Sequence, residues 1–233
     1  MATPVYVLTA MPTEEARLKD FFDSGPQSIM ELLEKPPTFR WAGFDLRTLD
    51  QAKIVRGEYL EVRVGSRKVI QLYPDGTLIY RAAADSSFLG WGREEEDFAE
   101  KPRLNPVAVI ETTTAFVHFF RSLIPRFEKL PREIIFRLEL RDAQVNGAKL
   151  YLTPYMVNSA AWLFEDERYD IREANVVDEV TVETDKIWEQ PDTVAYVLVQ
   201  KFYLFFNVPS DKIPYVVDRD GRKAIDVAAF PSA

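Results

Sequence analysis

The sequence YLEVRVGSRKVIQLYPDGTLIYR, residues 59–81, decides the fold class of this chain. Apolar and polar side chains alternate over 59–64, which is the two-residue period of a strand with one buried face. Gly65 opens a tight turn. Pro74-Asp75-Gly76 forms a second turn, because proline presets φ and glycine tolerates a positive φ. We therefore predict an antiparallel meander of three strands, over 59–64, 67–73 and 77–81.

Two long helices are predicted from capping residues and apolar spacing. Asn105 is a favourable N-cap and Pro106 suits the first helical position, so one helix is predicted from there to about Pro125. Its apolar residues recur at three- and four-residue spacing, as in a core helix. The second helix, over 191–206, is apolar on almost every side, which predicts that it is buried centrally or covered by a partner.

Further strands are predicted around these helices. Residues 133–141 alternate cleanly, with four apolar side chains on the inward side. Asn146-Gly147 predicts a hairpin turn before a strand over 149–153, and another strand is predicted over 179–183. By contrast, residues 94–104 are charged and contain a proline, so they are predicted to form a loop.

The first 37 residues are predicted to be a short helical N-terminal segment. Weak alternation over 4–10 also allows a short strand there. A helix is predicted from Thr13 to about Asp23, because Thr13 can cap it and acidic residues follow in its first turn. A second short helix is predicted over 28–35, ending before two prolines.

The order of these elements favours an α+β fold, because helices and strands do not alternate as in a doubly wound parallel sheet. We predict an antiparallel sheet, made of a β-meander plus a hairpin, packed against two long helices. The length fits one large domain or two small ones, and we predict a single α+β domain over residues 1–233.

The composition excludes several kinds of site. The chain has no cysteine and one histidine. Thiolate metal sites, disulfides, cysteine nucleophiles and zinc sites with several histidines are therefore excluded. No segment has the roughly 18 consecutive apolar residues of a membrane span, and the N-terminus lacks the basic start of a signal peptide. We expect a cytoplasmic protein with no cofactor and no membrane partner.

The net charge of −8 is concentrated in one segment. Residues 164–185 contain nine acidic and two basic side chains, so the rest of the chain is nearly neutral. Such a run is a solvated surface, a docking surface for a basic partner protein, or a set of carboxylates for a hard cation. The predicted docking residues are Glu165, Asp166, Glu167 and Asp170.

Four residues are candidates for binding a ligand or nucleic acid. Trp91 lies between two glycines, where its ring could stack on a base with Arg93 near a phosphate. Alternatively, Trp91 anchors its loop on the sheet. Arg137 and Arg141 lie on the same side of a predicted strand and could form a basic face. Glu139 lies between them, so ordinary pairing between strands is the alternative.

The sequence contains no recognisable catalytic constellation. His118 would need a carboxylate partner, and Glu111 is two helical turns away, so a packing role is favoured. The loop that begins at Asp218 lacks the glycine and glutamate of a calcium loop. Phosphate-binding loops and serine-nucleophile elbows are also missing. We therefore favour a protein that is not an enzyme.

Several segments resemble a bacterial protein region. These are "DLRT", "IVRGEYLEV", "LYPDGTLIYRA" and "FLGWG" around 46–92, "LNPVAVIETTTAFVHFF" from Leu104, and "LELRDA" in the hairpin over 138–152. Together they resemble the accessory or sensor-like region that lies C-terminal to the Schlafen-type (AlbA-like) ATP- or nucleic-acid-binding domain. The resemblance covers about 28–215. The Schlafen-type domain itself has no counterpart here, so its activities are not carried over.

The resemblance implies a free-standing accessory or sensor-like domain. Together with the missing catalytic motifs, it favours a non-enzymatic module that acts with a partner protein or a second copy of itself. Such a module would fit an accessory component of a bacterial defence system. The alternative is a nucleic-acid- or nucleotide-binding protein that uses the arginines and Trp91.

Overall fold

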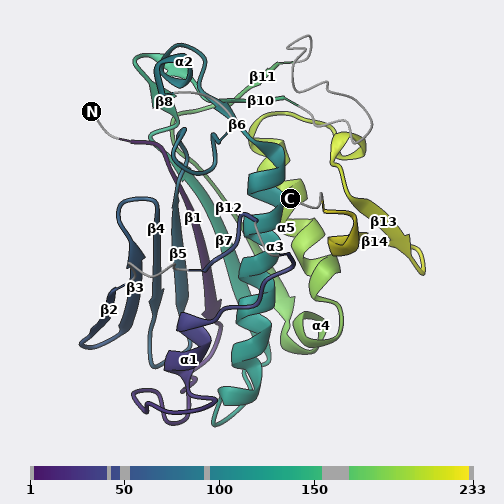
Figure 1. Cartoon of the computed structure of the whole chain (residues 1–233). Helices are drawn as coiled ribbons and strands as arrows, with labels where there is room; N and C mark the ends of the chain where they lie inside the picture. Colours follow the sequence, from purple (N-terminus) through teal and green to yellow (C-terminus); the bar gives the residue numbers. More distant parts are fainter. Residues whose placement is uncertain (1–2, 41–42, 48–52, 92–94, 154–167, 231–233) are drawn as a thin grey trace.

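A sheet of antiparallel strands organises this computed structural model, which describes residues 3–40, 43–47, 53–91, 95–153 and 168–230. Over those ranges the sheet has seven strands in the order β12-β7-β1-β5-β4-β3-β2 (Figure 1). The fold class is therefore α+β with an antiparallel sheet, as predicted. The strands are β1 (Val5–Pro12), β2 (Lys53–Arg56), β3 (Leu60–Val64), β4 (Lys68–Leu72), β5 (Leu78–Ala83), β7 (Glu133–Arg141) and β12 (Val176–Glu183).

The predicted meander is confirmed as β3, β4 and β5. Gly65 and Gly76 adopt φ values of 52° and 86°, which residues with a β-carbon rarely adopt. A β-carbon on Gly76 would also lie 2.4 Å from the ring of Phe127. The turn before β5 therefore requires glycine for two separate reasons.

The N-terminal strand lies at the centre of the sheet, between β5 and β7. This confirms the strand predicted over 4–10, but the helix predicted over 13–23 is wrong. The backbone N–H groups of Leu18 and Lys19 instead donate to the carbonyls of Pro74 and Arg126, both at 2.8 Å. These long-range bonds replace those of a helix. Helix α1 (Ile29–Glu34) matches the second predicted helix.

Two long helices cover one face of the sheet: α3 (Pro106–Leu123) and α5 (Pro191–Phe205) (Figure 1). The predicted cap of α3 is confirmed, because the Asn105 side chain accepts from the N–H of Val107 at 3.0 Å. Aromatic rings join the helices to the sheet, with 5.0 Å between the ring centroids of Tyr6 and Phe202. The core lies in this layer.

The chain itself covers the apolar sides of α5. One side packs on β7 and β12, another on α3, and a third on the hairpin of β13 (Val216–Arg219) and β14 (Arg222–Ile225). The central burial predicted for this helix is therefore confirmed. A partner protein is not needed to explain its apolar surface.

Short elements gather at the end of the sheet where β1 begins (Figure 1). The loop predicted over 94–104 is wrong, because it contains α2 and β6. The Asn146-Gly147 turn is confirmed, with φ of 50° and 84°, but its strands are only two residues long. The short elements are α2 (Glu95–Glu100), β6 (Arg103–Leu104), β8 (Gln144–Val145), β9 (Ala148–Lys149), β10 (Tyr151–Leu152) and β11 (Tyr169–Asp170).

One described helix, Pro106–Arg126, is long and apolar enough to cross a membrane. Within the fold, 83% of the most apolar 18-residue stretch of this helix is buried. The apolar length of this helix therefore reflects its position in the core.

Candidate interaction surface

The two faces of the main sheet differ in what covers them. Tyr6, Leu8 and Ala10 of β1 face the helices and are almost fully buried. Alternate residues face the other way, and no described helix packs there (Figure 1). We call this the open face. Its central part comprises Val5, Val7, Thr9, Met11, Glu61, Arg63, Val69, Gln71, Ile79, Arg81, Ala83, Ile135, Arg137, Glu139, Arg141, Val177, Glu179 and Thr181.

Arg137 and Arg141 lie on the open face and share one carboxylate. Glu139 forms an ion pair with Arg137 at 3.0 Å and accepts a hydrogen bond from Arg141 at 2.8 Å. Arg137 also lies 3.7 Å from Glu179 on the neighbouring strand. Both arginines are therefore paired with carboxylates of the sheet. Sequence analysis gave this pairing between strands as the alternative to a basic face.

A second polar group on the open face is built around Glu61. Its carboxylate accepts from Arg63 at 2.8 Å and from the Gln71 amide at 2.7 Å. Glu61 and Gln71 are both buried, although no described helix covers them. The long side chains of this face thus shield one another.

Trp91 lies on the helix side, away from Arg137 and Arg141. Its ring is 60% exposed and packs edge-on against Phe44, with 5.7 Å between centroids. Its carbonyl accepts from the Asn105 side chain at the start of α3. The structure therefore does not bring Trp91 together with the two strand arginines. Arg93 falls outside the described residues.

The acidic segment does not present its described acids on one face. Asp178 points to the helix side and bonds to Lys201 at 3.0 Å, whereas Glu179 points to the open face. Asp170, in β11, pairs with Arg168 at 2.6 Å. Glu165, Asp166 and Glu167 lie outside the described residues.

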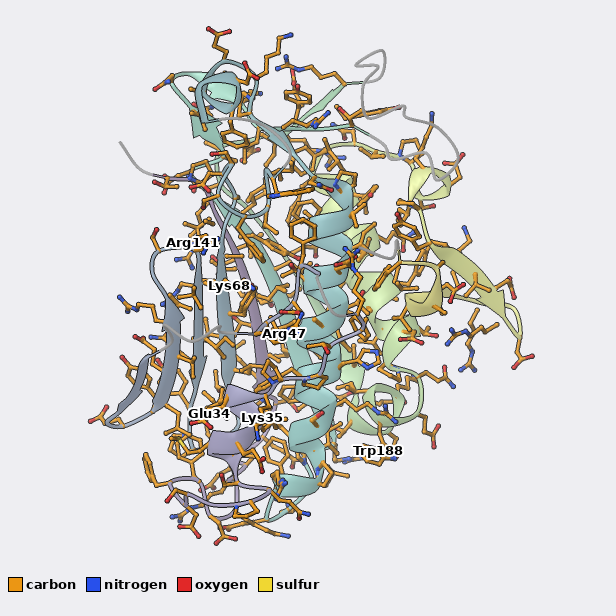
Figure 2. All side chains as sticks on the ribbon, in the orientation of Figure 1. Glu34, Lys35, Arg47, Lys68, Arg141 and Trp188 are labelled. Carbon is orange, nitrogen blue, oxygen red and sulfur yellow. The ribbon has the colours of Figure 1, made fainter. Side chains whose placement is uncertain are left out.

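Residues 43–47 form a strap across the helix side, and buried polar groups hold it. The N–H of Phe44 donates to Glu111 of α3 at 2.8 Å. Lys68 of β4 donates to the carbonyls of Asp45 at 2.6 Å and Arg47 at 3.3 Å (Figure 2). No local sequence pattern indicates this strap, because its bonds join residues more than 20 positions apart.

Burial shifts the acid–base behaviour of two groups that hold the strap. It lowers the pKa of Lys68 to about 8, although the nearby Asp45 carboxylate opposes the shift. Burial also raises the pKa of Glu111, against the opposing bonds from Phe44 and Arg40. Both groups bind atoms of this chain, so their geometry supports a structural role.

His118 has a carboxylate partner that sequence analysis missed. Its Nε2 lies 2.8 Å from Oδ1 of Asp192, which begins α5, and Arg219 donates to the other oxygen at 2.7 Å. Burial would raise the pKa of Asp192, but the bonds and charges of His118 and Arg219 hold it below its usual range. The cluster links α3, α5 and the C-terminal hairpin. Asp192 lies 74 positions from His118, so sequence spacing gave no signal.

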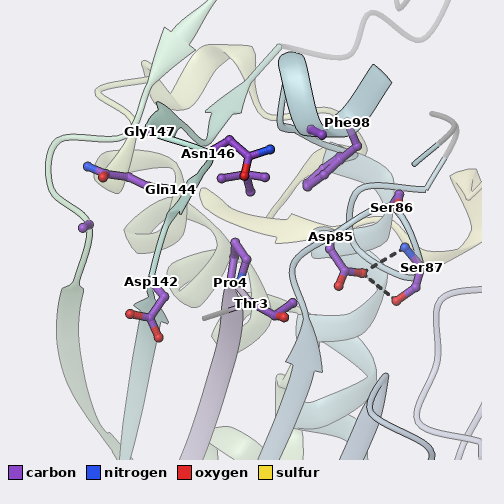
Figure 3. A pocket seen from close by; sticks show the side chains of 13 residues that line it. Thr3, Pro4, Asp85, Ser86, Ser87, Phe98, Asp142, Gln144, Asn146 and Gly147 are labelled. Carbon is purple, nitrogen blue, oxygen red and sulfur yellow. Dashed lines mark hydrogen bonds between the residues drawn. The ribbon is translucent and has the colours of Figure 1, made fainter. Parts of the chain in front are cut away.

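A pocket of about 610 Å³ lies where β1 begins, between α2 and the β8–β9 turn (Figure 3). Asp85 accepts from the N–H and hydroxyl of Ser87 at 2.9 and 2.5 Å. Asp142 and Asn146, also in the lining, are exposed, and no basic side chain is present among the residues that line the pocket. This is an open polar hollow.

A second hollow, of about 620 Å³, lies at the opposite end of β7 and β12. Its lining is strongly acidic, with Glu14, Glu133, Glu183 and Asp185. Within the described ranges, no group of three or more histidine, aspartate or glutamate side chains could hold a metal ion. Neither hollow therefore offers a defined cation site.

No protein-family model matches the chain, and no curated protein or solved structure does. The resemblance to the region that follows Schlafen-type domains remains a prediction from the residue pattern.

Proposed function

We propose that this protein is a non-enzymatic interaction module that binds a partner protein through its open face. The observation that supports the proposal is the one-sided cover of the sheet. All the described helices that pack on the main sheet lie on one face, and the opposite face presents partly exposed apolar residues on its central strands. Contiguous exposed apolar surface is a mark of protein interaction sites.

The composition of the open face also supports docking. Val5, Met11, Val69, Ile79 and Ile135 are each partly exposed and lie on four adjacent strands. Charged pairs flank them on β7 and β3. Specific protein interfaces have this arrangement, with an apolar centre and a polar rim.

The polar clusters on the helix side support docking over catalysis. Lys68 and Glu111 bind the strap, and His118 and Asp192 bind each other across two helices. We propose, as the sequence suggested, that the protein is an accessory module of the bacterial cytoplasm. An accessory component of a defence system fits this proposal.

Photocrosslinking tests the proposal in cells of the source organism. p-Benzoylphenylalanine replaces Ile79 on the open face in one variant and Leu204, an exposed residue on α5, in the control. We expect the Ile79 position to crosslink to one protein, and excess wild-type protein to prevent the crosslink. Excess protein carrying Ile79→Glu should not compete.

Three outcomes would overturn the proposal. The first is no crosslink from Ile79, and the second is the same set of proteins crosslinked from Ile79 and from Leu204. The third is crosslinking to nucleic acid instead of protein, which would favour the nucleic-acid-binding alternative.

A further inference from the structure

We propose that Arg81, at the centre of the open face, is the anchor that binds a carboxylate of the partner protein. The inference rests on the proposed function and specifies the chemistry of the partner: an apolar protein segment that carries an aspartate or glutamate. The argument comes from the neighbours of Arg81 in the sheet.

Apolar side chains surround Arg81 on the open face. In the strand register it lies directly between Val7 of β1 and Val69 of β4. On its own strand the nearest residues of the same face are Ile79 and Ala83. Arg81 is partly buried as a residue and forms no ion pair or hydrogen bond with any other described side chain.

The nearest carboxylates on the face are already bound by other groups. Glu139 lies two strands away, forms an ion pair with Arg137 and accepts a hydrogen bond from Arg141. Glu61 lies two strands away on the other side and accepts from Arg63 and Gln71. Of the arginines on the described open face, Arg81 is therefore the one without a carboxylate.

An unpaired arginine in an apolar setting is suited to bind a carboxylate. The planar guanidinium can bind both carboxylate oxygens at once, and removal of water strengthens that bond. Interface hot spots are enriched in arginine and lie at the centre of a ring that excludes water. Nucleic acid would instead require several cations along a groove, which this face does not present.

The test uses pairs of peptides that differ only in the central side chain, which is a carboxylate in one and an amide in the other. A bead-displayed library of ten-residue peptides carries alternating apolar residues with glutamate or glutamine at the centre. The wild-type protein, Arg81→Gln, Arg81→Lys and the control Lys129→Gln are compared. Lys129 is an exposed residue in the loop before β7, so the control loses the same charge far from the centre of the open face.

We expect glutamate peptides to bind the wild-type protein at least about tenfold better than their glutamine partners, the scale of one charge-assisted hydrogen bond. Arg81→Gln should abolish this preference and Arg81→Lys should reduce it, whereas Lys129→Gln should retain it. Circular dichroism and thermal melting check that each variant is folded.

Equal binding of glutamate and glutamine peptides would overturn the inference. So would a preference that survives in Arg81→Gln, the lack of any peptide that binds, or binding of an oligonucleotide that depends on Arg81. If the Ile79 crosslink persists without the glutamate preference, the carboxylate anchor is wrong and the docking face stands. Loss of both contradicts the proposed function as well.

Discussion

The two faces of the main sheet are made from the same strands but have different chemistry. On β1, Tyr6 and Leu8 pack under the helices, while Val7 and Thr9 face the opposite side. The helix side is filled with apolar rings, and its polar groups bind the strap or, like His118 and Asp192, bind each other. The open face mixes apolar residues with paired charges. The comparison teaches that folding buries one face almost fully, whereas the other keeps partly exposed apolar residues on its central strands.

The largest expected loss of stability comes from a substitution on the helix side of the sheet. Phe116→Ala removes a fully buried ring that packs near Phe136, with 6.3 Å between the ring centroids. The lost burial and the resulting cavity should lower the free energy of unfolding by about 3–5 kcal/mol. Urea denaturation measures the loss. A decrease below about 1 kcal/mol would show that this face is not the core.

The next largest loss of stability should come from replacing a side chain that holds the strap. Lys68→Met removes two hydrogen bonds to the carbonyls of Asp45 and Arg47 and leaves those acceptors without their donor. We expect a loss of about 1–3 kcal/mol in the free energy of unfolding. Lys129→Met, at an exposed loop position, is the matched control and should change stability little.

The lowered pKa of Lys68 also predicts that the free energy of unfolding rises with pH. Because burial lowers the pKa of Lys68 to about 8, the folded chain releases this proton before the unfolded chain does. The free energy of unfolding should therefore rise from about pH 8 to 9.5, by at most about 1.4 kcal/mol per pH unit. Lys68→Met should lack this rise. The same slope in both proteins would contradict the assignment.

The His118 cluster should give a smaller effect, with its pH dependence in the acid range. Asp192→Asn should lower stability by about 1 kcal/mol at pH 7, after allowance for solvent screening. The pKa of Asp192 lies below its usual range, so its carboxylate stabilises the fold above about pH 4. This contribution is lost as the pH falls through the folded pKa. Urea denaturation from pH 7 to pH 3 should show a weaker acid dependence in the variant.

The open face should give the smallest effect on stability. Ile79→Thr replaces a partly exposed residue with another β-branched side chain suited to a strand, so the free energy of unfolding should change by less than about 1 kcal/mol. Thermal melting measures this. A loss comparable with that of Phe116→Ala would show that the open face is part of the core.

Local signals in the sequence predicted the meander and the long helices. Gly65, Gly76 and the Asn105 cap act within a few residues, so their effects can be read from adjacent positions. Contacts between distant segments could not be predicted. The helix expected over 13–23 is replaced by bonds to Pro74 and Arg126, and His118 meets Asp192 only because α3 and α5 pack together.

The candidate site was harder to predict than the fold. The sequence singled out Arg137 and Arg141, but it did not show that Glu139 binds both. Arg81 ended a predicted strand and was not among the candidate binding residues. Its apolar neighbours come from β1 and β4, 74 and 12 positions away, so the sequence around it does not show them. Register, which sets these neighbours, is a property of the folded sheet.

The central position of β1 has a consequence for how the chain is made. The ribosome produces β1 well before its partners, because β5 and β7, which pair with its two edges, are made about 70 and 130 residues later. Until then both edges are free to pair with other chains. Removing residues 1–12 would divide the sheet into two smaller sheets and expose a new edge on each. We expect such a truncated chain to aggregate during synthesis.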